Sequence, residues 1–282
     1  MSDRRLPTFV IIGAMKAGTT SLWQALRAHP DVFTPGTKEL HYFSNPDRLE
    51  RGIEWYCEQF AGAGDALAIG EASTNYTKHP RRSGTAKRMA DAIPEARLVY
   101  LVRDPIERIR SHYLHVVHRY GERRPLAEAV RADPEYVDVS RYRMQADQYL
   151  EHFARSQLLV LTSESLKARP AATAARVFEF IGVDPDRART QPREVHRAAD
   201  RRLDTPLTAS ARRVPGYHAL RRLTPRPVRR LAARLLKPAA TGAVDPTIPV
   251  DLHDELVATL RDDVRGIREL VDDPTFDGWG IA

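Results

Sequence analysis

The residues with the clearest chemical potential lie near the start of the chain, in the stretch Gly13 to Leu22, which reads GAMKAGTTSL. Backbone N–H groups at the start of a helix, together with the helix dipole, favour an anion, and glycine lets the backbone close around it. Lys16 adds a cation, and the hydroxyl groups of Thr19 and Thr20 add further donors. The stretch therefore predicts a binding site for a phosphate-like anion.

The order of residues in this loop differs from that of a nucleotide triphosphatase. The Walker loop places its lysine directly after the second glycine and before the hydroxyl residue that binds Mg²⁺. Here Thr19 follows Gly18, and Lys16 precedes that glycine. The Walker pattern fails, and a lysine in this place can reach the bridging oxygen of a leaving phosphate. We expect no metal to be required, and the simpler alternative is an ordinary glycine-rich turn between a strand and a helix.

A second anion site is predicted in the stretch RDPIERIRSHY, which runs from Arg103 to Tyr113. Arg103 follows an apolar run and offers a planar fork of donors to a phosphate. Ser111 lies about two helical turns further on, so its hydroxyl can face the same anion. The alternative is that Arg103 pairs with a carboxylate and Ser111 faces solvent.

A general base is sought in the stretch KELHYF, which starts at Lys38. The unperturbed pKa of a histidine side chain is already close to the working pH, which makes His41 a candidate, whereas Glu39 needs burial to raise its own pKa. The structural alternatives are a surface ion pair between Glu39 and Lys38, and a core or positioning role for His41. The residues alone leave the choice between the two bases open.

The elements that must position these groups alternate along the chain. Short apolar runs predict strands, and the segments between them carry apolar residues at helical spacing. The predicted strands are 8–12, 67–70, 97–102 and 157–161. The predicted helices are 21–29, a helix from Pro105, 170–181 and about 249–271. This alternation predicts an α/β fold with a P-loop-like parallel sheet, flanked by helices on both faces.

Composition limits the remaining choices. The 282 residues are 42% hydrophobic, which excludes disorder and favours a single domain over 1–282. The positive charge behind the net +7 is concentrated in one segment, 187–237, which holds 14 Arg, one Lys and three acidic residues. We expect an Arg/Pro-rich insertion or lid at about 187–245, either merely solvated or facing an anionic membrane, a nucleic acid or an acidic acceptor. The single Cys57 and the lack of a long apolar run predict a reducing, cytoplasmic setting.

Two of these motifs occur in one known family. The segment KAGTTSL resembles the 5′-phosphosulfate loop of the sulfotransferases that use 3′-phosphoadenosine 5′-phosphosulfate (PAPS), and the stretch from Arg103 matches their R-D-P-x-x-R-x-x-S-x-Y motif. The resemblance implies a PAPS-dependent sulfotransferase that releases 3′-phosphoadenosine 5′-phosphate (PAP). It implies that Arg103 and Ser111 bind the 3′-phosphate. The residues implied for the 5′-phosphosulfate are Lys16, Ala17, Gly18, Thr19, Thr20 and Ser21.

The resemblance extends to the acceptor side. The segment KELHYF is similar to the K-E-x-H-[YF]-F segment of carbohydrate-type members, which implies Glu39 as the base with His41 as the competing candidate. The stretch GEASTNY resembles their G-E-x-[ST]-P-x-Y segment. Heparan-type members carry a lysine where this chain has Ala72, so a second catalytic lysine at that position is absent. We expect Glu71 and Tyr76 either to line the acceptor cleft or to hydrogen-bond the loop.

The predicted function is therefore transfer of a sulfuryl group from PAPS to a hydroxyl of a glycan, glycolipid or secondary metabolite in a bacterial enzyme. No nucleic-acid partner and no metal are expected, and the basic segment suggests peripheral contact with an anionic membrane. The oligomeric state is not readable from the sequence. A P-loop nucleotide-dependent kinase and a non-catalytic basic anion-binding protein are the alternatives, marked respectively by magnesium dependence and by salt-sensitive binding.

Overall fold

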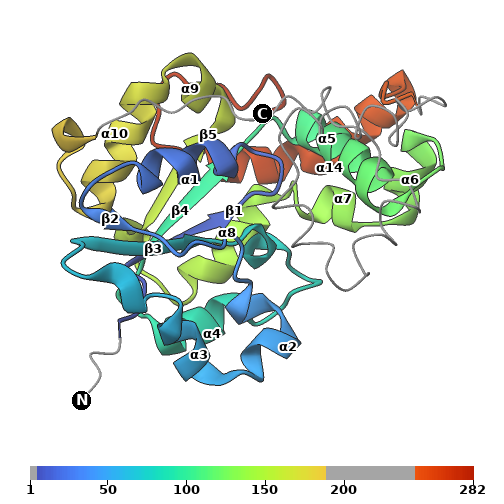
Figure 1. Cartoon of the computed structure of the whole chain (residues 1–282). Coiled ribbons are helices and arrows are strands. Elements are labelled where there is room, and N and C mark those ends of the chain that lie inside the picture. Colours follow the sequence, from blue (N-terminus) through green and yellow to red (C-terminus); the bar gives the residue numbers. More distant parts are fainter. Residues whose placement is uncertain (1–4, 189–244) are drawn as a thin grey trace, which may run out of the picture.

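The computed structural model describes residues 5–188 and 245–282. In this part of the chain five parallel strands form one sheet in the order β2-β3-β1-β4-β5, with β1 at its centre (Figure 1). The strands are β1 (Phe9–Gly13), β2 (Val32–Phe33), β3 (Ala68–Ala72), β4 (Arg97–Val102) and β5 (Leu158–Thr162). The α/β fold with a parallel sheet is confirmed.

The strands are apolar because both faces of the sheet are covered. Every residue of β1, β3 and β5 is buried, and only Arg97 of β4 is exposed, so the strands read as continuous hydrophobic runs. In the register of β1 with β3, Phe9 lies opposite Gly70. A Cβ atom at Gly70 would lie 2.2 Å from Cζ of Phe9, so this close approach requires glycine.

Helices cover the two faces and extend the molecule on one side. In Figure 1, α1 and α10 lie on one side of the sheet, α4 and α8 lie on the other, and α5, α6, α7 and α14 form a group beside it. The helices of the first half are α1 (Thr19–Arg27), α2 (Pro46–Leu49), α3 (Gly52–Glu58) and α4 (Thr85–Ala92). Those of the second half are α5 (Pro105–Tyr120), α6 (Leu126–Ala132), α7 (Glu135–Asp138), α8 (Tyr142–Leu150), α9 (Ser163–Ala168), α10 (Pro170–Ile181) and α14 (Val250–Arg268). Short 3₁₀ turns are η1 (Tyr42–Ser44), η2 (Ala61–Ala63), η3 (Thr74–Thr77), η4 (Arg155–Gln157) and η5 (Pro185–Arg187).

Local signals explain where the helices begin and end. The Asp104 carboxylate accepts hydrogen bonds from the N–H groups of Ile106 and Glu107 at 2.9 and 3.0 Å, which caps α5 directly after β4. Gly182 ends α10 with a φ of 84°, a conformation that favours glycine. On α14 the apolar residues at helical spacing are buried and pack with α5 and α6 in a second core. These residues are Leu252, Leu256, Leu260 and Val264.

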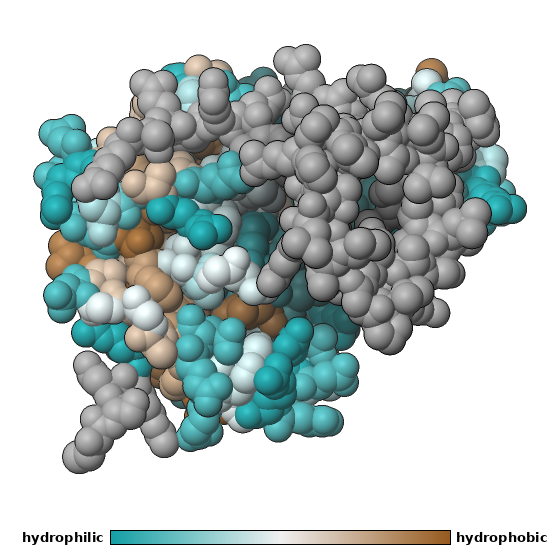
Figure 2. Space-filling view, viewed as in Figure 1, coloured by the Kyte–Doolittle hydropathy of each residue, from teal (hydrophilic) through white to brown (hydrophobic). Residues whose placement is uncertain are grey.

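The predicted strands correspond to β1, β3, β4 and β5, whereas β2 was missed. Its two residues, Val32 and Phe33, are too few to show any periodicity. The predicted insertion at about 187–245 falls almost entirely outside the described residues. In the described part of the chain, no helix combines the length and the apolar character needed to cross a membrane. On the face in Figure 2, hydrophilic residues predominate around α2 and α3.

Candidate active site

The predicted anion loop joins the centre of the sheet to α1. The N–H of Ala14 donates to the carbonyl of Leu101 at 2.7 Å, which fastens the loop to β4. The N–H of Ala17 turns back to the carbonyl of Ala14 at 3.2 Å. Gly18 then caps α1 with a φ of 98°, and the first N–H groups of that helix have no acceptor within it. This geometry fits a bound anion, as the sequence predicts.

The turn η3 lies directly against the start of this loop. A Cβ atom at Gly13 would lie 2.0 Å from Oγ1 of Thr77, so only glycine fits at this position without a shift of the turn. The Thr77 hydroxyl donates to the carbonyl of Ile12 at 3.3 Å. The segment that follows β3 is thereby held beside the anion loop, although 60 or so residues separate them in the chain.

Arg103 connects the second predicted anion site to the first. It stands at the end of β4, and its Nη1 donates to the carbonyl oxygen of Lys16 at 3.2 Å. Its Nη2 lies 3.2 Å from Oε2 of Glu107, which also accepts from Arg110 at 2.6 Å. The structure thus brings Arg103 to the loop and also shows the carboxylate partner that was considered as an alternative. Its guanidinium is four-fifths buried, with a side-chain exposure of 19%.

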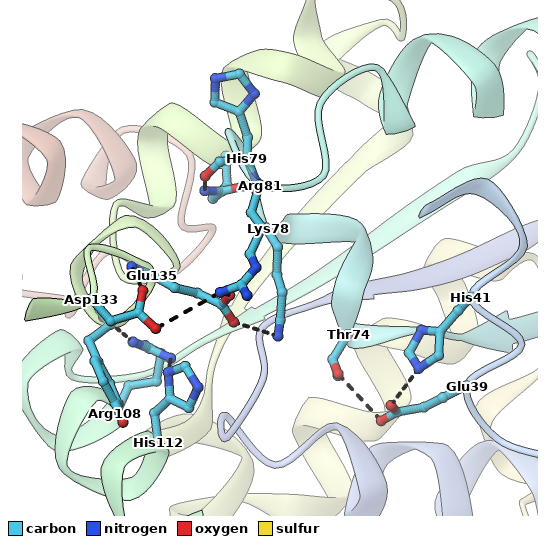
Figure 3. A network of polar contacts seen from close by, with 12 residues as sticks. Glu39, His41, Thr74, Lys78, His79, Arg81, Arg108, His112, Asp133 and Glu135 are labelled. Carbon is cyan, nitrogen blue, oxygen red and sulfur yellow. Dashed lines mark hydrogen bonds and ion pairs between the residues drawn. The ribbon is translucent and has the colours of Figure 1, made fainter. Parts of the chain in front are cut away.

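Ser111 lies on α5 and is half-buried. Two nearby residues of the same helix, Arg108 and His112, contact other parts of the fold. Arg108 is fully buried, and its Nε donates to Oγ of Ser140 at 2.6 Å. The ring of His112 packs against that of Tyr136 in a tilted arrangement, with centroids 4.6 Å apart. Burial, followed by the charges of Arg108 and other cations, lowers the pKa of His112 well below its ordinary value. This part of α5 is therefore anchored by a neutral histidine and a buried arginine (Figure 3).

The two candidate bases contact one another. Oε2 of Glu39 lies 3.2 Å from Nε2 of His41, and Oε1 accepts from the hydroxyl of Thr74 at 3.4 Å (Figure 3). The N–H of Glu39 donates to the carbonyl of Ala72 at 3.0 Å, which holds the segment at the carboxyl end of β3. The ion pair between Glu39 and Lys38, considered as the structural alternative, is also present, at 3.0 Å.

The pKa of Glu39 departs from the expectation that burial would raise it. Partial burial does act in that direction, but the hydrogen bond from His41 and the charge of Lys38 act against it and lower the pKa to about 2. Glu39 is therefore a carboxylate at neutral pH, ready to accept a proton but weakly basic while both partners are in place. The sequence could not predict this lowered pKa, because it does not give the distances from the Glu39 carboxylate to Lys38 and His41.

Backbone strain gathers at the same residues. Among the described residues, four that are not glycine have a positive φ: Lys16 at 73°, Glu39 at 69°, His41 at 55° and Trp279 at 57°. The left-handed conformation costs about 1–2 kcal/mol for such residues. Residues held in it concentrate at functional sites, where the surroundings must impose the conformation. Three of the four are the residues predicted to be catalytic.

A buried hydrogen-bond network holds the His41 segment. Glu71 accepts from the hydroxyls of Tyr56 and Tyr76 at 2.7 and 2.6 Å, and from Ser73 at 2.7 Å. Oγ of Ser73 in turn accepts from the N–H of His41 at 2.9 Å. Glu71 and Tyr76 are 1% and 2% exposed, so they hydrogen-bond the loop rather than line a cleft. Burial raises the pKa of Glu71, against the effect of its three hydroxyl donors.

Sequence reasoning missed several members of this arrangement. Tyr56 carries no signal beyond its type, because its partner Glu71 comes near only once α3 packs on β3. Ser73 fills the [ST] position of the motif around Glu71, but that motif does not show its contact with His41. Nζ of Lys78, at the end of η3, pairs with Oε1 of Glu135 at 2.8 Å in a largely buried contact (Figure 3). Among the residues that the structure describes, no group of three or more His, Cys, Asp or Glu side chains is placed to hold a metal ion.

The fold and this edge define an α/β protein whose loop after the central strand has a geometry that fits an anionic ligand. A family model described as the sulfotransferase domain matches residues 6–201. The chain therefore belongs to the sulfotransferase domain family, whose enzymes are PAPS-dependent. The resemblance read from the motifs is confirmed.

Known proteins place the chain within this family. It is 30% identical over 200 residues to the mouse bifunctional heparan sulfate N-deacetylase/N-sulfotransferase 4, and the match covers 64% of this chain and 23% of that protein. It is 31% identical over 192 residues to human heparan sulfate glucosamine 3-O-sulfotransferase 6, covering 64% and 53%. The chain thus spans about a quarter of the first relative and about half of the second. The crystal structure of a sulfotransferase from Alicyclobacillus acidocaldarius matches with a TM-score of 0.70, 26% identity, and coverage of 98% and 99%.

Proposed function

We propose that this chain transfers a sulfuryl group from PAPS to a hydroxyl group of its acceptor. The observation that carries the proposal is the convergence of three segments at one edge of the sheet. The anion loop follows β1, Arg103 follows β4 and contacts the loop at Lys16, and the Glu39 segment is bound to the end of β3. A cationic anion site thus adjoins a carboxylate that can take up a proton.

The residues present fit the proposed nucleotide. The loop offers the backbone N–H groups of Gly18, Thr19 and Thr20 and the hydroxyls of Thr19 and Thr20 to the 5′-phosphosulfate, whereas the N–H groups of Ala17 and Ser21 donate to the carbonyls of Ala14 and Gly18. Arg103 and Ser111 on the neighbouring strand and helix are the proposed contacts of the 3′-phosphate. When bound, PAPS supplies a sulfuryl group already activated by its link to phosphate. No metal is part of this proposal.

The chain's own residues then have two tasks. Lys16 places a positive charge where negative charge develops on the oxygen that leaves, which stabilises the transition state. Glu39 accepts the proton of the acceptor hydroxyl while the fold holds the reacting groups in line. His41, 3.2 Å from that carboxylate, orients it, and His41 acting as the base itself is the competing assignment.

A glycan is the acceptor class best supported among glycans, glycolipids and secondary metabolites. Both relatives described above are named for heparan sulfate, and the segments around Glu39 and Glu71 resemble the carbohydrate-type motifs. Ala72 is fully buried at the end of β3, so no lysine reaches the acceptor from that position. We therefore propose a glycan whose recognition differs from that of heparan sulfate.

The organisation and setting of the protein belong to the same proposal. We propose one sulfotransferase domain over 1–282, in which the segment at about 187–245 is an insertion and α14 closes the chain. The arginines of that segment are the proposed contact with an extended acceptor or an anionic membrane surface. We further propose that the protein is a bacterial enzyme that works in the cytoplasm.

The test is direct transfer of label. The purified chain is incubated with PAPS radiolabelled in its sulfuryl group and with a panel of glycans, glycolipids and phenols, without magnesium. We expect label in a glycan hydroxyl, and none with Glu39→Gln. Lys87→Ala is the matched control, because Lys87 is exposed on α4 and pairs only with Asp91 among the contacts described for it. Transfer from ATP with magnesium, and none from PAPS, would replace this function with that of a kinase.

A further inference from the structure

Lys38 stands between the anion loop and the candidate base. Its Nζ donates to Oγ1 of Thr19, the first residue of α1, at 3.3 Å. The same nitrogen donates to Oε1 of Glu39 at 3.0 Å. The side chain is 17% exposed, so its charge is only partly screened by water. One ammonium group is thus shared by the two halves of the site.

Of the groups described in contact with Glu39, Lys38 is the one that also contacts the anion loop. His41 contacts the second carboxylate oxygen, and its own N–H is fixed by Ser73 in the Glu71 network. From η3 the neighbour is the neutral hydroxyl of Thr74, and from β3 it is a backbone carbonyl. Among these contacts of Glu39, the one that continues to α1 is the contact with Lys38.

We propose that Lys38 couples the anion loop to the base: an anion held beside Thr19 competes for the Lys38 ammonium and weakens its ion pair with Glu39. This inference rests on the proposed function, in which that anion is the 5′-phosphosulfate. Lys38 acts through Glu39 and is therefore a positioning residue. The consequence is a carboxylate that becomes a better proton acceptor only when the nucleotide is in place.

Physical chemistry favours such competition. The two oxygens are 3.0 and 3.3 Å from the same nitrogen, so a small rotation of the side chain shifts the ammonium from one partner to the other. The 5′-phosphosulfate carries two negative charges in total, and the 5′-phosphate of PAP carries up to two, so either attracts the ammonium more strongly than a single carboxylate does. The low pKa of Glu39 in the structure described here is the resting state that this coupling would relieve.

Coupling of this kind is reciprocal, so it can be measured from the nucleotide side. If the anion weakens the pair of Lys38 with Glu39, then Glu39 must weaken the binding of the anion. We would measure the affinity for PAP by calorimetry in the wild type, Glu39→Gln, Lys38→Met and the double variant, at neutral pH. Such a cycle isolates the interaction of the two side chains.

We expect Glu39→Gln to tighten PAP binding about three- to tenfold more when Lys38 is present than in the Lys38→Met background. Equal factors in both backgrounds would overturn the proposal, because the carboxylate would then act on the anion through space alone. The matched control is Lys87→Met with Asp91→Asn, an exposed ion pair of 2.8 Å on α4, which should leave the affinity unchanged. Absence of PAP binding in all four proteins would instead contradict the proposed function, and this inference with it.

Discussion

The two halves of the candidate site are built differently. The cofactor side, defined as residues 13–22 with Arg103, consists mainly of backbone: Gly18 caps the helix, and Arg103 donates to a carbonyl. The base side, defined as residues 39–41 with 71–76, depends on buried side chains whose hydrogen bonds converge on Glu71. The cofactor side can therefore lose a functional group without losing its shape. On the base side, function and stability are coupled.

Lys16→Ala gives the largest expected effect and tests the cofactor side. Removal of the charge that we propose stabilises the leaving oxygen should lower the rate of transfer by about 10²–10³-fold or more. The fold should remain, because the backbone carbonyl of Lys16 that contacts Arg103 is retained. The measurements are the rate of sulfuryl transfer and the melting temperature. Turnover at the wild-type rate would remove Lys16 from the mechanism.

Glu71→Ala tests the base side and should affect stability as well as rate. The hydroxyls of Tyr56 and Tyr76 would be left buried without their acceptor, which we expect to lower the free energy of unfolding by about 3–5 kcal/mol. Glu71→Gln keeps an acceptor oxygen and should cost less. Urea unfolding of both variants gives the comparison. A variant that loses neither stability nor rate would show that the network does not support the base.

Ser73→Ala separates positioning from stability on the same side. The N–H of His41 loses its acceptor, so we expect about a tenfold fall in kcat with an unchanged KM for PAPS. The matched control is Thr8→Ala, which removes a similar hydroxyl that accepts from the N–H of Ile69 at 3.0 Å near the start of β1. Equal kinetic effects of the two substitutions would contradict a specific role for Ser73.

We expect acid to lower the stability through His112 on α5 and through Glu39 on the base side in different pH ranges. On α5, the helix that follows Arg103, burial holds the pKa of His112 well below its ordinary 6.5, so below that pH the unfolded state takes up a proton that the folded state does not. Stability should fall there by up to about 1.4 kcal/mol per pH unit, and less steeply in His112→Gln.

On the base side, the pKa of Glu39 is lowered from 4.5 to about 2. Its contribution is present above pH 4.5 and is lost only as the pH falls from there toward 2. The side chain is 35% exposed, so we expect this loss to be small. Urea unfolding of the wild type and Glu39→Gln from pH 7 to pH 4 checks the order. Loss of the Glu39 contribution above pH 5 would contradict it.

The same contrast explains what the sequence could predict. The loop residues and Arg103 lie next to the ends of strongly apolar strands, so local pattern is enough to place them at one edge of a parallel sheet. The support of His41 is different, because Tyr56 meets Glu71 only through the packing of α3 on β3. The low pKa of Glu39 likewise depends on distances of about 3 Å to Lys38 and His41, which no spacing in the chain specifies.

The central claim is that the loop after β1 and Arg103 together bind the nucleotide of a sulfotransferase. The most direct measurement is calorimetric titration of the full chain with PAP, without magnesium, comparing the wild type with Arg103→Ala. We predict micromolar binding in the wild type and a loss of about 100-fold in the variant, because a charged phosphate partner is removed. No binding by the wild type, or equal binding by both proteins, would contradict the account.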